Sequence, residues 1–421
     1  MLYALAAKLA GAASGVIPPS GAKAAIAVRA RHGIRRRYAT WAAAHREKHR
    51  PLLWVHAPSV GEGLMARPVV SLIRSRHPDT QLAYTFFSPS AEEFSRTLDV
   101  DFRDYLPFDD AGDMRAALDA LAPRALVFSK VDVWPELVRQ AHQRGVRLGM
   151  ISAALAPQSS RRSSVARLLL HDAYALLDAV GAVDQSTAER LTELGVRGDV
   201  IEVTGDTRFD QVWQRAEAAD RATGVLGRLA SDRPTLIAGS PWPADETPLL
   251  DAIARVRRRI PTLRVILAPH EVSREHLESL VRWARQQGFS LGRVDELEAA
   301  STDVVLVDRY GVLGDLYALA DIAFVGGGFH DAGLHSVLEP AVFGAPVLFG
   351  PRHHGSRDAQ LLLSTNGARS VGSAADIERA MSEWLEAPAE RRAAGARARA
   401  VVDQGRGAAE RSVRLVERLM A

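Results

Sequence analysis

Apolar runs alternate with amphipathic stretches along the chain from Leu52 onward, which is the pattern of an α/β protein. The predicted strands fall into two series. The first series is Leu52–His56, Leu82–Phe86, Ala125–Phe128, Arg147–Ile151, Val180–Val183 and Ile201–Val203. The second series is Thr235–Ala238, Arg264–Leu267, Val304–Val307, Ile322–Val325 and Val347–Phe349. The pattern therefore predicts two doubly wound, Rossmann-like lobes that face a central cleft.

A polar, helical stretch without an apolar strand separates the two series, and the lobe boundary is expected near Gln211–Gly224. This predicts an N-terminal arm over residues 1–50, a first lobe over residues 51–213 and a second lobe over residues 214–421. A terminal helix is predicted at Ala408–Met420, and it could cross back to pack on the first lobe. With 421 residues, the chain is long enough for both lobes to bury full cores.

The arm combines an apolar segment with a basic one. Leu2–Ile17 is shorter than the roughly 20 residues that span a bilayer, so it predicts a membrane-associating helix that lies in the interface. The net charge is +3, but the first fifty residues carry ten Lys or Arg and one acid, so the body is acidic. Arg29–Arg37, with Tyr38 and Trp41, predicts docking on anionic headgroups. A signal peptide and a nucleic-acid-binding arm are the alternatives, although no nucleic-acid motif accompanies the arm.

The chain has no cysteine, which excludes disulfides and thiol chemistry. Its most distinctive stretch is Asp321–Pro351, which predicts a strand, a glycine-rich turn, a helix and a second strand. Such a unit brings backbone N–H groups close to a phosphate. The helix is expected to begin near Leu334, and Glu339 could accept both ribose hydroxyls of a nucleotide, the alternative being a helix-surface glutamate. The residues expected to bind a donor nucleotide in this stretch are Gly327, Gly328, Gly333, Leu334, His335, Ser336 and Glu339.

Two further segments follow the first and second strands of the second lobe, where ligands bind in open α/β sheets. They contribute Ser240, Pro269 and His270 to the expected donor site. Neither His270-Glu271 nor His353-His354 has a second pair of residues at ligand spacing, so no metal site is expected.

Glu62 lies in a short motif at the end of the first predicted strand. Ser59 and Glu62 have the spacing of a capping box, in which Glu62 would only reach back to the Ser59 N–H. The functional alternative is that Glu62 is a general base that accepts a proton from an incoming hydroxyl. Ser59, Gly61 and Gly63 would then let an acceptor approach the carboxylate closely.

Four cations are candidates for contacts with substrate anions. Lys130 follows the strand Ala125–Phe128, and Arg208 follows the last strand of the first lobe. Arg352 and Arg357 lie in a loop after the glycine-rich stretch. The alternatives are a solvated lysine at a strand end, an Arg208 that pairs with Asp206 or Asp210, and an ordinary surface loop.

Four segments together carry a family resemblance: Ser59–Glu62, Trp134-Pro135, Thr204–Asp206 and the run from Gly326 to Pro351. In this order and spacing they closely resemble the 3-deoxy-D-manno-octulosonic acid (Kdo) transferases of Gram-negative lipopolysaccharide synthesis. The resemblance covers nearly the whole chain. One departure is Lys130–Pro135, where many members read Glu-Thr-Glu-Leu-Trp-Pro, so this chain resembles a divergent branch.

The resemblance implies a GT-B glycosyltransferase fold with the acceptor on the first lobe and the donor CMP-Kdo on the second. It implies an inverting transfer to a lipid A precursor at the cytoplasmic face of the inner membrane, with no cofactor and no metal. Nucleic acid is not an expected partner. By position, Glu62 matches the catalytic base, Arg208 matches a Lys or Arg position, and Gly328, His335, Ser336 and Glu339 match the donor-binding segment.

Two other functions stay open at the level of the sequence. One is a GT-B transferase or epimerase that uses a UDP-sugar, which the choice between CMP and UDP would distinguish. The other is a non-catalytic nucleotide-sugar-binding protein docked on a membrane, which would bind CMP without transferring sugar.

Overall fold

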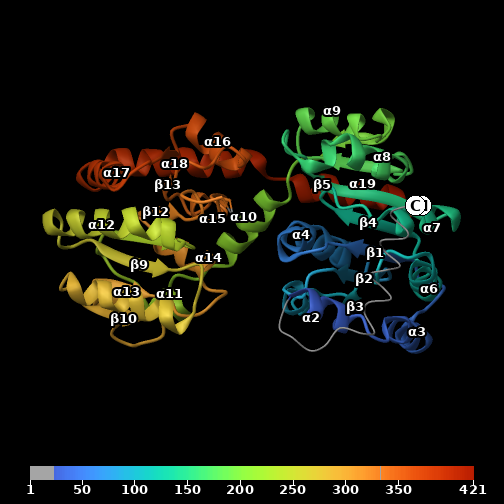
Figure 1. Ribbon diagram of the computed structural model, residues 1–421, viewed down its shortest axis with the longest axis horizontal. Coiled ribbons are helices and arrows are strands. Elements are labelled where there is room, and N and C mark those ends of the chain that lie inside the picture. Colours follow the sequence, from blue (N-terminus) through green and yellow to red (C-terminus); the bar gives the residue numbers. More distant parts are fainter. Residues whose placement is uncertain (1–22, 332) are drawn as a thin grey trace. The chain divides into compact units, whose positions relative to one another are not determined.

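The computed structural model describes residues 23–331 and 333–421, so the apolar segment predicted at Leu2–Ile17 lies outside the described residues. The chain divides into two compact units (Figure 1). Unit 1 comprises the described residues up to Gln211 together with Arg406–Ala421, and unit 2 comprises Val212–Gly405. The first crossing between units lies inside a helix, α10 (Arg208–Ala218), two residues before the predicted boundary at residue 213.

Unit 1 is built on a seven-stranded sheet with the order β3-β2-β1-β4-β5-β6-β7, and all of its neighbouring strands are parallel. Each of the central strands is buried along its length because helices cover both faces of the sheet, as parallel sheets require. The strands are β1 (Leu52–His56), β2 (Gln81–Phe86), β3 (Phe102–Tyr105), β4 (Ala125–Ser129), β5 (Arg147–Ala153), β6 (Ala179–Ala182) and β7 (Ile201–Val203).

Unit 2 has a second parallel sheet of seven strands, with the order β10-β11-β9-β8-β12-β13-β14. Both sheets therefore confirm the predicted doubly wound α/β fold. The strands are β8 (Thr235–Gly239), β9 (Arg264–Ala268), β10 (Leu291–Arg293), β11 (Val304–Leu306), β12 (Ile322–Val325), β13 (Val347–Phe349) and β14 (Ala368–Ser370).

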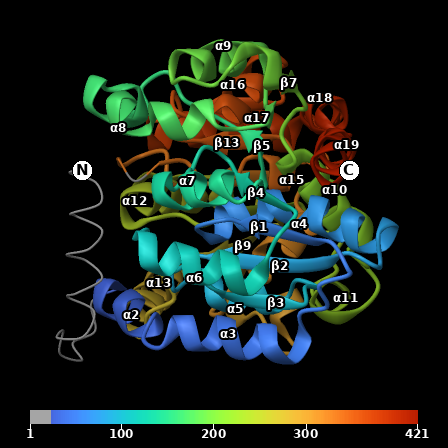
Figure 2. The same cartoon turned by 90° about the vertical axis from the view of Figure 1, so that its right-hand side faces the viewer.

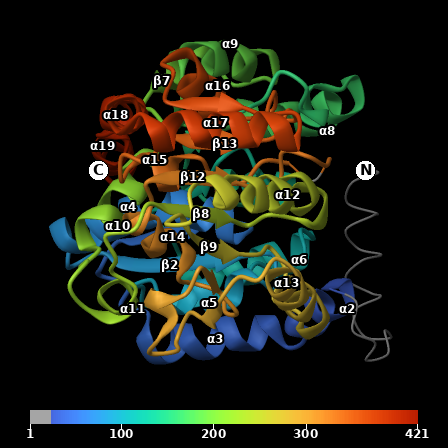
Figure 3. The ribbon, with the colours of Figure 1, turned by 90° about the vertical axis from the view of Figure 1, so that its left-hand side faces the viewer.

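Helices join most successive strands in both units, as crossovers between parallel strands require, and further helices precede or follow the sheets. In unit 1 they are α2 (Lys23–Ala30), α3 (Ile34–His45), α4 (Val60–Arg76), α5 (Ala91–Arg96), α6 (Ala111–Leu121), α7 (Pro135–Gln143), α8 (Ser164–Ala175), α9 (Gln185–Glu193) and α19 (Ala408–Met420). In unit 2 they are α11 (Gly224–Arg228), α12 (Pro243–Arg259), α13 (Arg274–Gln286), α14 (Leu313–Leu316), α15 (Leu338–Ala341), α16 (Arg357–Ser364), α17 (Ala374–Glu386) and α18 (Pro388–Gly405). Figure 3 shows α12 beside α17 on one face of the unit 2 sheet.

Part of the basic segment is built into unit 1, which corrects the prediction for Arg31 and Arg37, whereas Arg29, Arg35 and Arg36 are exposed. Helix α3 lies beside α6 (Figure 2). Arg31 is only 4% exposed and donates to the carbonyl oxygens of Leu106 and Phe87, at 2.7 and 3.0 Å. Arg37 makes two hydrogen bonds to the carboxylate of Asp104, at 2.7 and 2.9 Å. These guanidinium groups are paired with protein oxygens, so they are not available to lipid headgroups.

The aromatic residues of the arm are also part of the unit. Tyr38 is fully buried and donates to the Tyr105 carbonyl oxygen at 2.9 Å, while Trp41 donates to the Asp101 carbonyl oxygen at 3.1 Å. Within residues 23–331 and 333–421, no helix has the length and apolarity needed to cross a membrane.

Helix α19 returns to unit 1 at the end of the chain. Val416 and Leu419 are buried in the core of that unit, and Leu419 fills the space above Gly149 of β5. The Asp210 carboxylate accepts hydrogen bonds from the N–H groups of Gly407 and Ala409, at 2.7 and 2.8 Å. This side chain supplies the N-terminal cap that α19 lacks from its own N-cap residue, Gly407.

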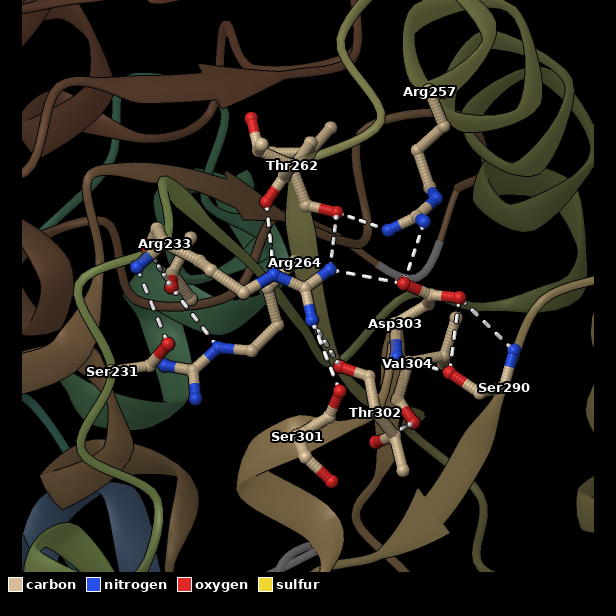
Figure 4. Close-up of polar contacts among 12 residues, drawn as sticks. Ser231, Arg233, Arg257, Thr262, Arg264, Ser290, Ser301, Thr302, Asp303 and Val304 are labelled. Atoms are coloured by element: carbon tan, nitrogen blue, oxygen red, sulfur yellow. Dashed lines mark hydrogen bonds and ion pairs between the residues drawn. The ribbon is translucent and has the colours of Figure 1, made fainter.

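An arginine cluster ties together the amino ends of the unit 2 strands (Figure 4). The Asp303 carboxylate, just before β11, pairs with Arg233 at 2.9 Å and with Arg257 at 2.6 Å. Arg233 also donates to the carbonyl oxygens of Thr262 and Thr302, both at 3.0 Å. Arg264 is 1% exposed, and burial lowers its pKa to about 10, which leaves it charged at neutral pH. The cluster lies at the end of the sheet away from the carboxyl ends of the strands.

Candidate functional site

The strand order locates one switch point in each sheet, where neighbouring strands lead to crossovers in opposite directions. In unit 1 it lies between β1 and β4, and in unit 2 it lies between β8 and β12. Ligands of open α/β sheets bind outside the carboxyl ends of the strands at such points. Glu62 follows β1 and Lys130 follows β4, whereas Ser240 follows β8 and Gly326 follows β12.

Glu62 lies in the first turn of α4, and its carboxylate is held on both oxygens. The Ser59 hydroxyl donates to Oε2, and the Lys130 ammonium lies 3.2 Å from Oε1. Ser59 is the N-cap residue of α4, but its side chain makes no cap hydrogen bond. The capping box is therefore absent, because the Ser59 hydroxyl bonds to the Glu62 carboxylate instead of to a backbone N–H of α4.

The surroundings of Glu62 favour its ionised form. Burial raises its pKa, but the Ser59 hydrogen bond, the Lys130 charge and the Lys130 hydrogen bond together outweigh burial and lower the pKa. The carboxyl is thus ionised at neutral pH, as a proton acceptor must be. Tyr84 packs nearby, and burial together with the Glu62 charge raises the pKa of its phenol well above the usual value.

The two glycines beside Glu62 have different surroundings. Gly61 is exposed, and a Cβ there would meet only the Ser59 Oγ, at 3.7 Å. Gly63 is buried, and a Cβ there would overlap the Phe94 ring and lie 2.7 Å from the Tyr84 hydroxyl. Gly63 therefore makes room for core side chains, which corrects the expectation that it opens a path for the acceptor.

A buried polar network that the sequence did not indicate lies beneath the same strand ends. His56, the last residue of β1, is fully buried, and burial lowers its pKa to about 3. Its Nε2 accepts a hydrogen bond from the Trp134 indole at 2.9 Å, so Nδ1 carries the proton and donates to Thr85 Oγ1 at 3.0 Å. The neutral imidazole thereby fixes Trp134, which precedes α7, against the end of β1.

Unit 2 contains a cavity of about 370 Å³ at its switch point, within the size range of small-ligand sites. Five of the residues predicted to bind a donor line it: Ser240, Pro269, His270, His335 and Glu339. The predicted residues that are not among its lining are Gly327, Gly328, Gly333, Leu334 and Ser336. Lining residues that the prediction missed include Arg215, Arg309 and Tyr310, which lie on α10 and on the loop after β11.

The glycine-rich turn is organised by a buried carboxylate. Asp245 is fully buried in α12 and accepts from the N–H groups of Gly327 at 2.8 Å and Phe329 at 3.0 Å. Gly327 has φ +94°, and a Cβ there would overlap the backbone of Gly333, so only glycine fits. The N–H group of Gly327, one of the residues expected to bind the donor, thus binds Asp245.

The helix expected near Leu334 begins four residues later, at Leu338, and α15 ends at Ala341. The expected helix N-terminus at Leu334–Ser336 is therefore wrong. The His335 N–H instead donates to the Gly326 carbonyl oxygen at 3.1 Å, which closes the turn in an extended conformation. Pro340 and the short distance to Gly344 leave no room for a longer helix before β13.

Stacked rings form one wall of the cavity region. The Trp242 indole stacks on His270 with ring centres 3.8 Å apart and donates to His335 Nε2 at 3.1 Å. His335 therefore has its proton on Nδ1. Burial lowers the pKa of both His270 and His335, and neighbouring imidazoles add to the effect, so both rings are neutral at neutral pH. Neutral stacked rings form a surface suited to a nucleobase or sugar.

Glu339 lines the same cavity, and burial raises its pKa. Arg215 opposes this effect, while Asp315, which pairs with Arg215 at 2.7 Å, adds to it. Tyr317 is also buried here, and its hydroxyl occupies the space that a side chain at Gly239 would need. The cavity thus offers one carboxyl group and two cations, Arg215 and Arg309, which are paired with Asp315 and Asp295.

Two of the remaining predicted cations, Arg208 and Arg352, bind protein carboxylates. Arg208 bonds to Asp206, with the closest contact at 2.6 Å, which is the alternative considered for it. Arg352 pairs with Asp331, and Arg357 is the first residue of α16. Neither residue lines the cavity. Within the described ranges 23–331 and 333–421, no group of three or more His, Asp or Glu side chains is arranged to hold a metal ion.

Comparison with known proteins bears on what these two sites do. A family model described as 3-deoxy-D-manno-octulosonic-acid transferase (kdotransferase) matches residues 32–211, which is most of unit 1. The 3-deoxy-D-manno-octulosonic acid transferase of Haemophilus influenzae is 26% identical over 369 residues, covering 87% of this chain and 86% of the relative. The enzyme of the same name from Chlamydophila psittaci is 29% identical, covering 82% and 79% of the two chains.

Solved structures share the fold. The UDP-GlcNAc 2-epimerase from Neisseria meningitidis, solved with UDP-GlcNAc bound, superposes with a TM-score of 0.62 over 88% of this chain and 99% of its own. Its sequence identity is 13%, so it supports the GT-B arrangement of two Rossmann-like domains and nothing about the substrate. The sequence relatives span both units and carry one name. The chain is therefore similar to the 3-deoxy-D-manno-octulosonic acid transferases over most of its length.

Proposed function

We propose that this chain is an inverting glycosyltransferase that moves Kdo from CMP-Kdo to a hydroxyl group of a lipid A precursor in lipopolysaccharide synthesis. The acceptor hydroxyl loses its proton to Glu62 as its oxygen forms a bond to the anomeric carbon of Kdo. The bond from that carbon to the CMP phosphate breaks, and CMP leaves with the electron pair. Attack on the face opposite the leaving group inverts the configuration.

The observation that carries this proposal is Glu62 at the switch point of unit 1. Its carboxylate is ionised, partly exposed and held by two side chains, so it is ready to accept a proton without further ordering. In a capping box the Ser59 hydroxyl would accept from a backbone N–H of α4, and it makes no such bond.

Unit 2 supports the donor half of the proposal. Its cavity combines neutral stacked rings with the carboxyl of Glu339 and two cations, Arg215 and Arg309. In the proposed reaction the rings bind the nucleoside, Glu339 accepts ribose hydroxyls, and the arginines stabilise the charge that grows on the leaving phosphate. A CMP-sugar carries a single phosphodiester charge, so the proposed reaction uses no metal and no cofactor, and EDTA should leave its rate unchanged.

The test is incubation of the purified chain with CMP-Kdo and a tetra-acylated lipid A precursor, followed by mass spectrometry of the lipid. A mass increase of one or more Kdo residues supports the proposal. Glu62→Gln should lower turnover at least about a hundredfold with the fold intact by circular dichroism. Glu93→Gln, on the exposed face of α5, is the matched control and should have wild-type turnover. Wild-type turnover in Glu62→Gln would remove Glu62 as the base.

A UDP-sugar enzyme, the alternative that the sequence left open, is the second candidate. CMP should raise the melting temperature of the chain more than UDP does under the proposed function, and the opposite order would favour the UDP-sugar enzyme. CMP binding without any sugar transfer would instead indicate a non-catalytic binding protein.

Membrane association at the cytoplasmic face of the inner membrane is part of the proposal. Since Arg31, Arg37, Tyr38 and Trp41 serve unit 1, the proposed contact with the bilayer falls to the apolar segment Leu2–Ile17. The full chain should float with anionic vesicles, and a chain without residues 1–22 should not. Equal flotation of the two would place the contact elsewhere.

A further inference from the structure

We propose that Lys130 is the positioning residue for the base: its ammonium holds the Glu62 carboxylate in the orientation that receives the acceptor's proton. The inference rests on the proposed transferase function. It deepens that function by assigning a specific task to a residue that sequence reasoning could only treat as a substrate contact or a solvated lysine.

The backbone at Lys130 is the first argument. Lys130 has φ +65°, a left-handed conformation that is unfavourable for a residue with a Cβ. It persists because the surroundings fix the segment: the Lys130 N–H donates to the Ile151 carbonyl oxygen at 2.9 Å, and the Tyr174 hydroxyl donates to the Val131 carbonyl oxygen at 2.7 Å. Asp132 is paired with Arg161. Such local strain is retained at functional sites.

The direction of the side chain is the second argument. The left-handed turn after β4 directs Lys130 toward α4, where its Nζ lies 3.2 Å from Glu62 Oε1. Ser129, the preceding residue, donates from Oγ to the Glu62 carbonyl oxygen at 2.8 Å. Two successive residues of one strand end thus hold the backbone and the side chain of Glu62. Because the Ser59 hydroxyl also donates to Oε2, both carboxylate oxygens are held and the group is fixed about the Cγ–Cδ bond of Glu62.

The chemistry follows from this geometry. Each carboxylate oxygen keeps a free lone pair after accepting one hydrogen bond, so the fixed group can still accept a proton. Removing the ammonium frees the carboxylate to rotate and also removes a nearby positive charge that lowers the Glu62 pKa. Without that charge the pKa rises, so a smaller fraction of Glu62 is ionised at a given acidic pH.

Three variants separate positioning from structure. Lys130→Gln keeps an unbranched side chain, one bond shorter, without the charge, and Lys130→Arg keeps the charge. Both have the same backbone cost at φ +65° as lysine, because each has a Cβ and no branch there. Lys48→Gln, on an exposed residue after α3, is the control for loss of a lysine charge.

The measurement is the pH profile of kcat/KM for Kdo transfer, with kcat and KM for both substrates. Lys130→Gln should lower kcat roughly tenfold to a hundredfold while changing either KM less than about threefold. The acid limb of the pH profile of Lys130→Gln should move to higher pH. Lys130→Arg should recover most of kcat and the wild-type limb, and Lys48→Gln should match the wild type. An unmoved acid limb in Lys130→Gln, or no recovery in Lys130→Arg, would overturn the proposal.

A second readout needs no turnover, so it distinguishes failure of this inference from failure of the proposed function. In protein labelled with ¹³C at glutamate carboxyls, the Glu62 resonance is identified by its loss in Glu62→Gln. Its titration midpoint should be higher in Lys130→Gln than in the wild type, even if the chain transfers no Kdo. Equal midpoints would show that the Lys130 ammonium does not act on Glu62.

Discussion

The surroundings of Glu62 and Glu339 shift the pKa values of the two carboxyl groups in opposite directions. At Glu62 two donors outweigh burial and lower the pKa, whereas at Glu339 burial prevails over the neighbouring Arg215 and raises it. A carboxylate with satisfied oxygens is a stable proton acceptor. A buried carboxyl with few donors lacks partners that a bound ribose could supply, so Glu339 is destabilising until its ligand arrives.

Glu339→Gln should therefore raise the melting temperature by a few degrees at pH 7.5 and weaken CMP binding. The folded-state pKa lies above the unfolded one, so ionisation at neutral pH costs the folded state free energy that Gln does not. The gain should disappear as the pH falls toward about 4, where the carboxyl is protonated in both states. Melting curves at several pH values and CMP titrations check this, and a variant that melts lower at pH 7.5 would contradict it.

At the residue scale, sequence reasoning succeeded where a side chain follows a strand at a switch point. Ser240, His270 and His335 line the cavity for this reason. It failed where a contact depends on long-range packing. No local signal indicates that Asp245 takes up the N–H groups of the glycine-rich turn, or that His56 binds Trp134 seventy-eight positions away.

At the scale of elements, the contact between α4 and α5 depends on a missing side chain. Gly63→Ala places a Cβ against the Phe94 ring and the Tyr84 hydroxyl, so it should destabilise unit 1 by roughly 1–3 kcal/mol. Gly61→Ala is the matched control, since its Cβ meets only the Ser59 Oγ, and it should be neutral or stabilising. Urea unfolding of both variants tests this, and equal midpoints would show that the core adapts around Gly63.

The arginine cluster of unit 2 allows a second test at this scale. Asp303→Asn leaves Arg257, which is 8% exposed, without its ion-pair partner and should cost at least about 2 kcal/mol in unfolding free energy. Asp308→Asn, which removes the partner of the more exposed Arg293, should cost less than about 1 kcal/mol. The two variants should separate clearly in a guanidinium titration, and a smaller loss for Asp303→Asn than for Asp308→Asn would contradict the assignment.

The predicted strands recur in the structure, but three observed strands were missed. Strands β3, β10 and β14 have three or four residues each, lie toward the sheet edges and contain charged or small residues. Their apolar signal is too short to be distinguished from a loop.

The basic helix α3 was interpreted as a docking surface because arginines on a surface and arginines bound to protein oxygens look the same in a sequence.

At the scale of the whole molecule, unit 1 is made of two segments that are far apart in the chain. Asp210 links them, because it lies at the first crossing and caps α19 just after the second. Asp210→Ala should lower the unfolding free energy of the chain by roughly 1–2 kcal/mol, the usual cost of a lost N-terminal cap. Asp199→Ala, at an exposed position, should have almost no effect. Chemical denaturation measures both, and equal stability of the two variants would contradict the capping role.

The discontinuity of unit 1 has a consequence for biosynthesis. A chain that emerges from the ribosome in order completes Val212–Gly405 before it releases Arg406–Ala421, so unit 2 can close its core while unit 1 still lacks α19. Until then the surface that receives Val416 and Leu419 stays open to water and to other chains. Release of the last helix thus covers this surface and ends the period in which the nascent enzyme is prone to aggregate.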